Sequence, residues 1–121
     1  MRSRWITHKG KRIFCSDYSG LRDDVAALQA ENAAVIAEIT RQPPDSVLEL
    51  VNVHDSVASR EAVAVLKASA SKTKPYLHKV AVVGVHGVVK VLAQAVSQVS
   101  GLGLTLFATE EEAKDWLVAE P

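Results

Sequence analysis

The stretch KVAVVGV, residues 79–85, decides the fold class of this 121-residue chain. It is a continuous apolar run dominated by valine, which is typical of a strand buried on both faces of a parallel sheet. Such a strand needs covering layers above and below it. Together with the helical patterns that flank it, the run predicts an α/β domain.

Strand-like and helical segments alternate outward from this run. Upstream, residues 46–53 predict a strand rich in Val and Leu, and apolar spacing predicts helices over residues 21–41 and 60–71. Asp23 and Asp24 are expected in the first turn of the earlier helix, and residues 72–76 are expected to form a loop. Downstream, we expect a helix from Gly87 to Ser100, a short strand over residues 104–108, and a last helix that begins at a Thr109–Glu112 capping box.

The N-terminal segment adds a hairpin. Residues 4–8 and 12–16 predict two antiparallel strands around the turn Lys9-Gly10-Lys11. The whole order predicts one domain over residues 1–121. Its five-stranded, mostly parallel mixed sheet has an antiparallel N-terminal edge hairpin, and four helices accompany it.

Charge and cysteine content exclude several function classes. Fourteen basic residues balance fourteen acidic ones, so no global field favours nucleic acid or an acidic membrane as a partner. The basic residues of the hairpin are interpreted as protection of a sheet edge. The longest apolar run is too short to span a bilayer. Cys15 is the sole cysteine, which permits no intrachain disulfide and suits a cytoplasmic location.

Several local stretches carry a family resemblance: WITHKGKRIF (5–14), DYSG (17–20), KPY (74–76), VVGV (82–85) and EAKDWL (112–117). With the order of elements, they resemble STAS domains, and most of all the SpoIIAA-like group often labelled STAS/SEC14. The resemblance covers nearly the whole chain. It implies successive strand order and a non-enzymatic, bacterial protein-interaction or regulatory module. The alternative is a binding domain for a small anionic or lipid-like ligand.

The resemblance also implies a candidate phosphorylation position. STAS regulators carry a phosphorylated serine at the start of the helix after their third strand, and Ser59 falls there. Val57 and Arg60 depart from the Asp-Ser-Ser-Gly-like motif of those regulators. The simpler interpretation of Ser59 is a helix N-cap, whose hydroxyl accepts a bond from an unpaired backbone N–H.

Polar residues gather after the strands, at the edge where ligands bind in parallel sheets. They form our candidate ligand-binding set: Asp17, Tyr18, Ser19, His54, Asp55, Ser56, His86, Gly87 and Thr109. Helix N-termini and two histidines there suit an anion or phosphate. The competing interpretation, which we favour, is that loops and caps select these residue types.

No catalytic or metal motif is recognised. Ser56, His86 and Asp17 form a Ser-His-Asp set by composition, but the Gly-x-Ser-x-Gly elbow is missing. The four histidines lie on separate elements without a metal-ligand spacing. We therefore expect no enzyme activity, no metal and no cofactor, and a hydrolase or transferase ranks last.

The segment from Gly87 to Ser100 carries more valine than one buried face needs. The additional valines could serve a homodimer contact, a protein partner or a lipid-like cavity. They could equally pack against two neighbouring elements of the same chain. Asn32 falls on the apolar face of the first helix, where a buried amide needs a partner.

Overall fold

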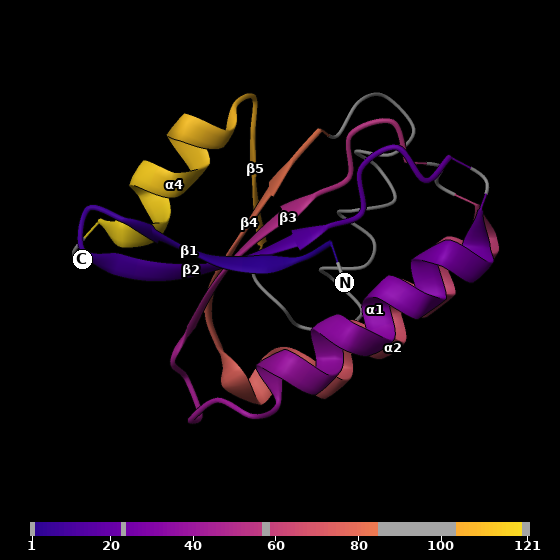
Figure 1. Cartoon of the computed structure of the whole chain (residues 1–121), viewed down its shortest axis with the longest axis horizontal. Helices are drawn as coiled ribbons and strands as arrows, with labels where there is room; N and C mark the ends of the chain where they lie inside the picture. Colours follow the sequence, from indigo (N-terminus) through magenta and orange to yellow (C-terminus); the bar gives the residue numbers. More distant parts are fainter. Residues whose placement is uncertain (1, 23, 57–58, 85–103, 120–121) are drawn as a thin grey trace.

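A single mixed sheet organises the chain. The computed structural model describes residues 2–22, 24–56, 59–84 and 104–119. The strands are β1 (Arg4–His8), β2 (Lys11–Asp17), β3 (Val47–Asn52), β4 (Leu77–Val83) and β5 (Leu104–Phe107), and they lie in the order β1-β2-β3-β4-β5 (Figure 1). β1 pairs antiparallel with β2, and the three later pairs are parallel. The predicted five-stranded mixed sheet with an antiparallel N-terminal edge is therefore confirmed.

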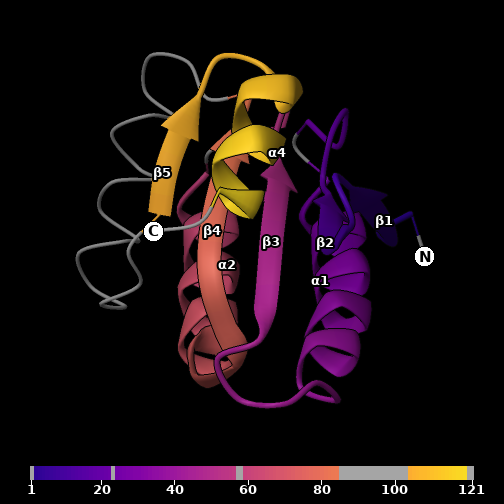
Figure 2. The same cartoon turned by 90° about the vertical axis from the view of Figure 1, so that its left-hand side faces the viewer.

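Helices cover both faces of the sheet. The described α-helices are α1 (Val25–Ile39), α2 (Arg60–Thr73) and α4 (Glu110–Val118). α1 and α2 lie side by side on one face, and α4 lies on the other (Figure 2). The helix expected from Gly87 to Ser100 lies outside the described residues, and so does its expected role as a dimer contact.

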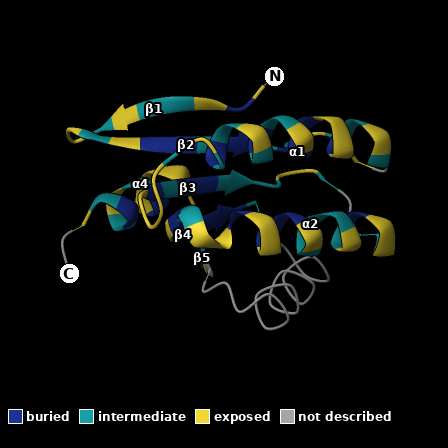
Figure 3. Ribbon diagram, turned by 90° about the horizontal axis from the view of Figure 1, so that it is seen from below, coloured by how far each residue is buried: buried dark blue, intermediate teal, exposed yellow. Residues whose placement is uncertain are grey.

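Two apolar cores follow from this layering. One joins Phe14, Val47 and Val80 of the sheet to Leu28 and Val35 of α1. The helices turn buried residues toward the sheet and exposed ones away from it (Figure 3).

The second core lies beneath α4. It joins Ile13, Leu50 and Ala81 to Ala113 and Leu117. Because successive strand residues point to opposite faces, β3 and β4 contribute to both cores, and this explains why both strands are mostly apolar.

Two local predictions were wrong. Residues 72–76 are not a loop: α2 continues to Thr73, and Lys74–Tyr76 form a 3₁₀ turn with a proline near its start. Proline is tolerated in a first helical turn because its missing N–H has no partner to lose there. Asp24 does not lie in the first turn of α1 but caps it, since its Oδ1 accepts the Ala27 N–H at 2.9 Å.

None of the helices within the described ranges has the length and apolar character needed to cross a membrane.

Candidate functional site

Two loops are paired through their backbones at the carboxyl edge of the sheet. In the β2–α1 loop, the N–H of Gly20 donates to the carbonyl oxygen of His54 at 2.8 Å, and the N–H of Arg22 donates to that of Asp55 at 3.2 Å. Arg22 also forms a parallel bridge with Ser56 of the β3–α2 loop. The β2–β3 pairing thus continues beyond both strands. We call the side chains of Arg22, His54, Asp55 and Ser56 the paired-loop surface.

The backbone of this surface adopts uncommon conformations. Arg22 and Asp55 have φ angles of 51° and 56°, in the left-handed region that costs energy for residues with a Cβ. Such conformations persist where the surroundings fix them, and they are concentrated at functional sites. Gly84, which directly follows β4 and has a φ of 86°, packs closely under this surface, because a Cβ there would lie 2.5 Å from the backbone nitrogen of His54.

The side chains of the surface lie largely toward solvent. Arg22, His54 and Asp55 are exposed, and Ser56 is half-buried. Arg22 Nε lies 3.5 Å from Asp55 Oδ2, an exposed ion pair of the kind that contributes little to stability. The two side chains can therefore leave each other and bind groups of a partner at a small cost in free energy. Arg22 was not among the predicted site residues, because the sequence predicted a helix that already included it.

Asp17 and Ser19 form a closed local motif beside this surface. The N–H and hydroxyl of Ser19 donate to Asp17 Oδ1 at 3.0 and 2.6 Å. Arg2 donates to the Ser19 carbonyl oxygen at 2.6 Å and lies 3.5 Å from Asp17 Oδ1. Burial raises the pKa of Asp17, but the bonds from Ser19 and the charge of Arg2 outweigh it, so the net pKa is lowered. The carboxylate is used in organising the loop.

Tyr18, one of the predicted ligand-binding residues, has a buried side chain. It is 3% exposed and belongs to the core beneath α1. Asn32 donates to its hydroxyl at 2.9 Å and to Ser69 Oγ at 2.8 Å, and burial raises the pKa of Tyr18 above its ordinary value. Tyr18 therefore belongs to a buried polar network, which also gives Asn32 the partners it was expected to need.

Two further predicted residues act as helix caps. Thr109 Oγ1 accepts the Glu112 N–H at 3.2 Å and thereby begins α4, as the capping box predicts. Ser59 Oγ accepts the Ala62 N–H at 3.1 Å and begins α2, which confirms the N-cap interpretation. His86 and Gly87 lie outside the described residues, so the Ser56–His86–Asp17 set stays an untested hypothesis.

A buried carboxyl group was missed by sequence reasoning. Glu49 lies on β3 in register with Phe14 and Val80, on the face covered by α1 and α2, and it is 7% exposed. Its hydrogen-bond donor is the hydroxyl of Ser16. Burial raises the pKa of Glu49 to about 7, which the bond from Ser16 only partly offsets. The sequence did contain a sign of this buried carboxyl group, because Glu49 is the single acid inside the apolar run VLELV.

A small cavity lies at the opposite edge of the sheet. Its volume is about 220 Å³, below the ordinary range for small-molecule sites, and Leu48, His78 and Lys79 help to line it. Lys79 Nζ donates to the carbonyl oxygens of Trp116 and Ala119 at 3.1 and 3.0 Å. This cation therefore stabilises the C-terminal end of α4.

Comparison with known proteins gives no family assignment: no family model matches the chain, and no curated protein is significantly similar to it.

Proposed function

We propose that this chain is a non-enzymatic, STAS-like protein-interaction or regulatory module that contacts its partner through the paired-loop surface. The observation that carries the proposal is the backbone pairing of two loops that presents Arg22, His54 and Asp55 to solvent. A surface fixed before binding loses little conformational entropy when a partner arrives, so modest contacts give useful affinity.

The hydrogen bonds and burial of the other candidate residues support an interaction module rather than an enzyme. Asp17 is bonded to Ser19, and Thr109 and Ser59 each cap a helix. Tyr18 is buried beneath α1. These bonds give each of these groups a structural role, and exposed charge is then the main feature of the part of the edge that the structure describes.

The same geometry favours the module over a binder of small anionic or lipid-like ligands. Within the described residues, the paired-loop surface is formed by exposed side chains at the carboxyl edge, whereas a cavity of about 220 Å³ lies at the other edge. A site that encloses a small molecule buries most of that molecule's surface. A protein partner needs no such enclosure.

Ser59 gives this surface a candidate means of regulation. It starts α2, the helix that follows the β3–α2 loop, and Arg60 comes directly after it. A phosphate at this position would lie at a helix N-terminus, where negative charge is favoured, and would change the charge beside Asp55 and Ser56.

The test compares one substitution at two exposed arginines. Asn tolerates a positive φ, so Arg22→Asn removes the charge and spares the loop. Arg41→Asn removes a matched exposed charge near the end of α1, where Arg41 pairs with Glu38 at 3.1 Å. Each tagged variant is expressed in the source cell, and the co-purifying proteins are quantified by mass spectrometry.

We expect a discrete protein that is retained by the wild type and by Arg41→Asn and is lost at least about tenfold with Arg22→Asn, the factor equivalent to one lost charged contact. Equal retention by both variants would exclude the paired-loop surface. Recovery of a small molecule and no protein would favour the ligand-binding alternative.

A further inference from the structure

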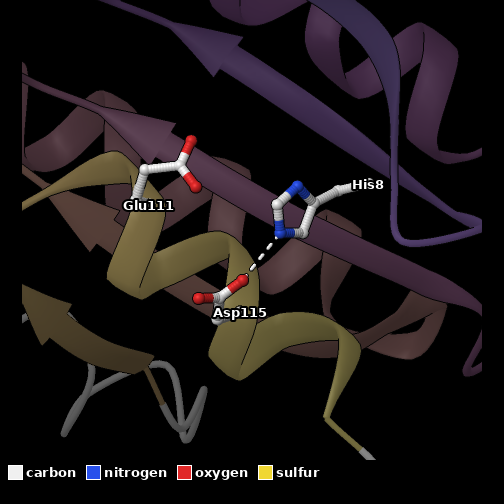
Figure 4. A group of neighbouring side chains, drawn as sticks. All are labelled: His8, Glu111 and Asp115. Carbon is white, nitrogen blue, oxygen red and sulfur yellow. Dashed lines mark hydrogen bonds and ion pairs between the residues drawn. The ribbon is translucent and has the colours of Figure 1, made fainter.

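Three metal-ligating side chains meet where the end of β1 lies beside α4 (Figure 4). His8 Nε2 lies 2.8 Å from Asp115 Oδ1. His8, Glu111 and Asp115 each offer one ligand atom, and these three atoms lie within 4.8 Å of one another. Glu111 and Asp115 are four residues apart on α4, so their carboxylates project from the same face of that helix.

We infer that His8, Glu111 and Asp115 form a binding site for a divalent transition-metal ion of the zinc class. An imidazole nitrogen and carboxylate oxygens bind Zn²⁺ at about 2.0–2.2 Å, and three such ligands leave one position for water. The imidazole decides the class, because Mg²⁺ and Ca²⁺ prefer oxygen ligands alone.

The exposure of the three groups differs in a way that suits metal binding. The side chain of His8 is 18% exposed, whereas that of Asp115 is 51% exposed. The partly buried imidazole has less room to move than the two exposed carboxylates, whose ion pairs with lysines can be exchanged for an ion at small cost in free energy. Atoms already within 4.8 Å need only small rotations to reach the separations that a common ion requires.

Two lysines supply positive charge at this cluster in the absence of an ion. Lys9 Nζ lies 3.0 Å from Asp115 Oδ1, and Lys114 Nζ lies 3.9 Å from Glu111 Oε1. Lys9 competes with a metal ion for the same oxygen, and its removal should therefore strengthen binding.

The site is separate from the paired-loop surface. β1 runs antiparallel to β2, so His8 at its end lies at the edge of the sheet opposite to the loops. An ion here would connect the N-terminal hairpin to the C-terminal helix, two segments about a hundred residues apart in the chain. Its binding is expected to raise the temperature of unfolding as well.

The experiment is a calorimetric titration of the full, untagged chain with Zn²⁺, repeated with Co²⁺ to record the visible absorption of the bound ion. His8→Ala and Glu111→Gln each remove one ligand. His78→Ala is the matched control, because His78 also pairs with an exposed aspartate, Asp45, at 3.1 Å. Lys9→Gln removes the competing ammonium group. Circular dichroism checks that each variant is folded.

We expect the wild-type chain to bind one Zn²⁺. His8→Ala and Glu111→Gln should each lower the affinity at least about tenfold. His78→Ala should keep the wild-type affinity, and Lys9→Gln should bind Zn²⁺ more tightly. Two results would overturn the inference. One is the absence of wild-type binding below about 1 mM Zn²⁺, and the other is binding that His8→Ala and Glu111→Gln leave unchanged.

Discussion

The hydroxyl of Ser16 donates a hydrogen bond of 2.5 Å to a carboxyl oxygen of Glu49, across the β2–β3 pair and on the face of the sheet that α1 and α2 cover. Both side chains are buried, and Ser16 has no exposed surface. An ionised carboxylate in such surroundings loses its hydration, and one hydroxyl replaces only part of it. The central strand therefore carries a carboxyl group that the fold prefers to keep protonated.

The first prediction concerns the pH dependence of stability. The folded chain keeps the Glu49 proton up to about pH 7, whereas the unfolded chain loses it near the ordinary value of 4.5. The contribution of Glu49 is therefore fully present below about pH 4.5 and is lost as the pH rises to about 7. Glu49→Gln keeps a neutral acceptor for Ser16 and should be free of this loss.

Urea unfolding at several pH values tests this prediction. The stability of Glu49→Gln relative to wild type should rise with pH, by about 3 kcal/mol across the whole window. Other carboxyl groups are common to both proteins and cancel in the difference. Glu61→Gln, at an exposed position of α2, should keep the wild-type dependence. A pH-independent difference for Glu49→Gln would mean that the carboxyl ionises normally in the folded chain.

The second prediction concerns the buried network around Asn32. Asn32→Ala leaves the hydroxyls of Tyr18 and Ser69 without the donor they now share, and we expect a loss of about 1–3 kcal/mol in the free energy of unfolding. Gln29→Ala, at an exposed position of the same helix, should change stability little. Chemical denaturation of both variants measures the contrast, and equal effects would assign no energetic role to the network.

The third prediction compares two glycines with positive φ. Gly20, at φ 71°, has open space where a Cβ would lie, whereas at Gly84 that atom would lie 2.5 Å from the backbone nitrogen of His54. Gly20→Ala should therefore cost only backbone strain, about 1–2 kcal/mol. Gly84→Ala should cost more, because the His54 backbone must also shift. Thermal unfolding of the two variants measures the difference between their losses of stability. Similar losses would show that the His54 backbone shifts away from a Cβ at position 84 at little cost.

The fourth prediction concerns the cap of α2. Ser59→Ala removes the acceptor of the Ala62 N–H and should lower stability by about 0.5–2 kcal/mol. Ser71→Ala makes the same substitution at an exposed position within the helix and should be neutral or slightly stabilising. Denaturation midpoints measure both. An unchanged midpoint for Ser59→Ala would show that the cap does not contribute to the free energy of unfolding.

The sheet and the start of α4 could be predicted from the sequence because their signals are local. The valine run ending β4, the hairpin turn at Lys9-Gly10 and the Thr109 capping box each depend on neighbouring residues. Periodicity cannot show on which side of a loop a side chain lies. Tyr18 and Ser19 are adjacent, yet one is in the core and the other helps to organise the edge.

The remaining features depend on contacts that no local pattern encodes. The positive φ of Arg22 follows from its pairing with the β3–α2 loop. The approach of His8 to Asp115 depends on the placement of α4 against the N-terminal hairpin. Glu49 was visible as an acid inside an apolar run, but its burial became clear only when α1 and α2 were placed over that face.

The most direct test of the proposed function is native mass spectrometry of the chain purified gently from its source cell. This single measurement reports both protein partners and bound small molecules. The proposed module predicts a species whose mass is that of the chain plus a second, different protein, and its loss when Arg22 is replaced by Asn. The chain alone, or the chain with only a small molecule bound, would contradict the proposal.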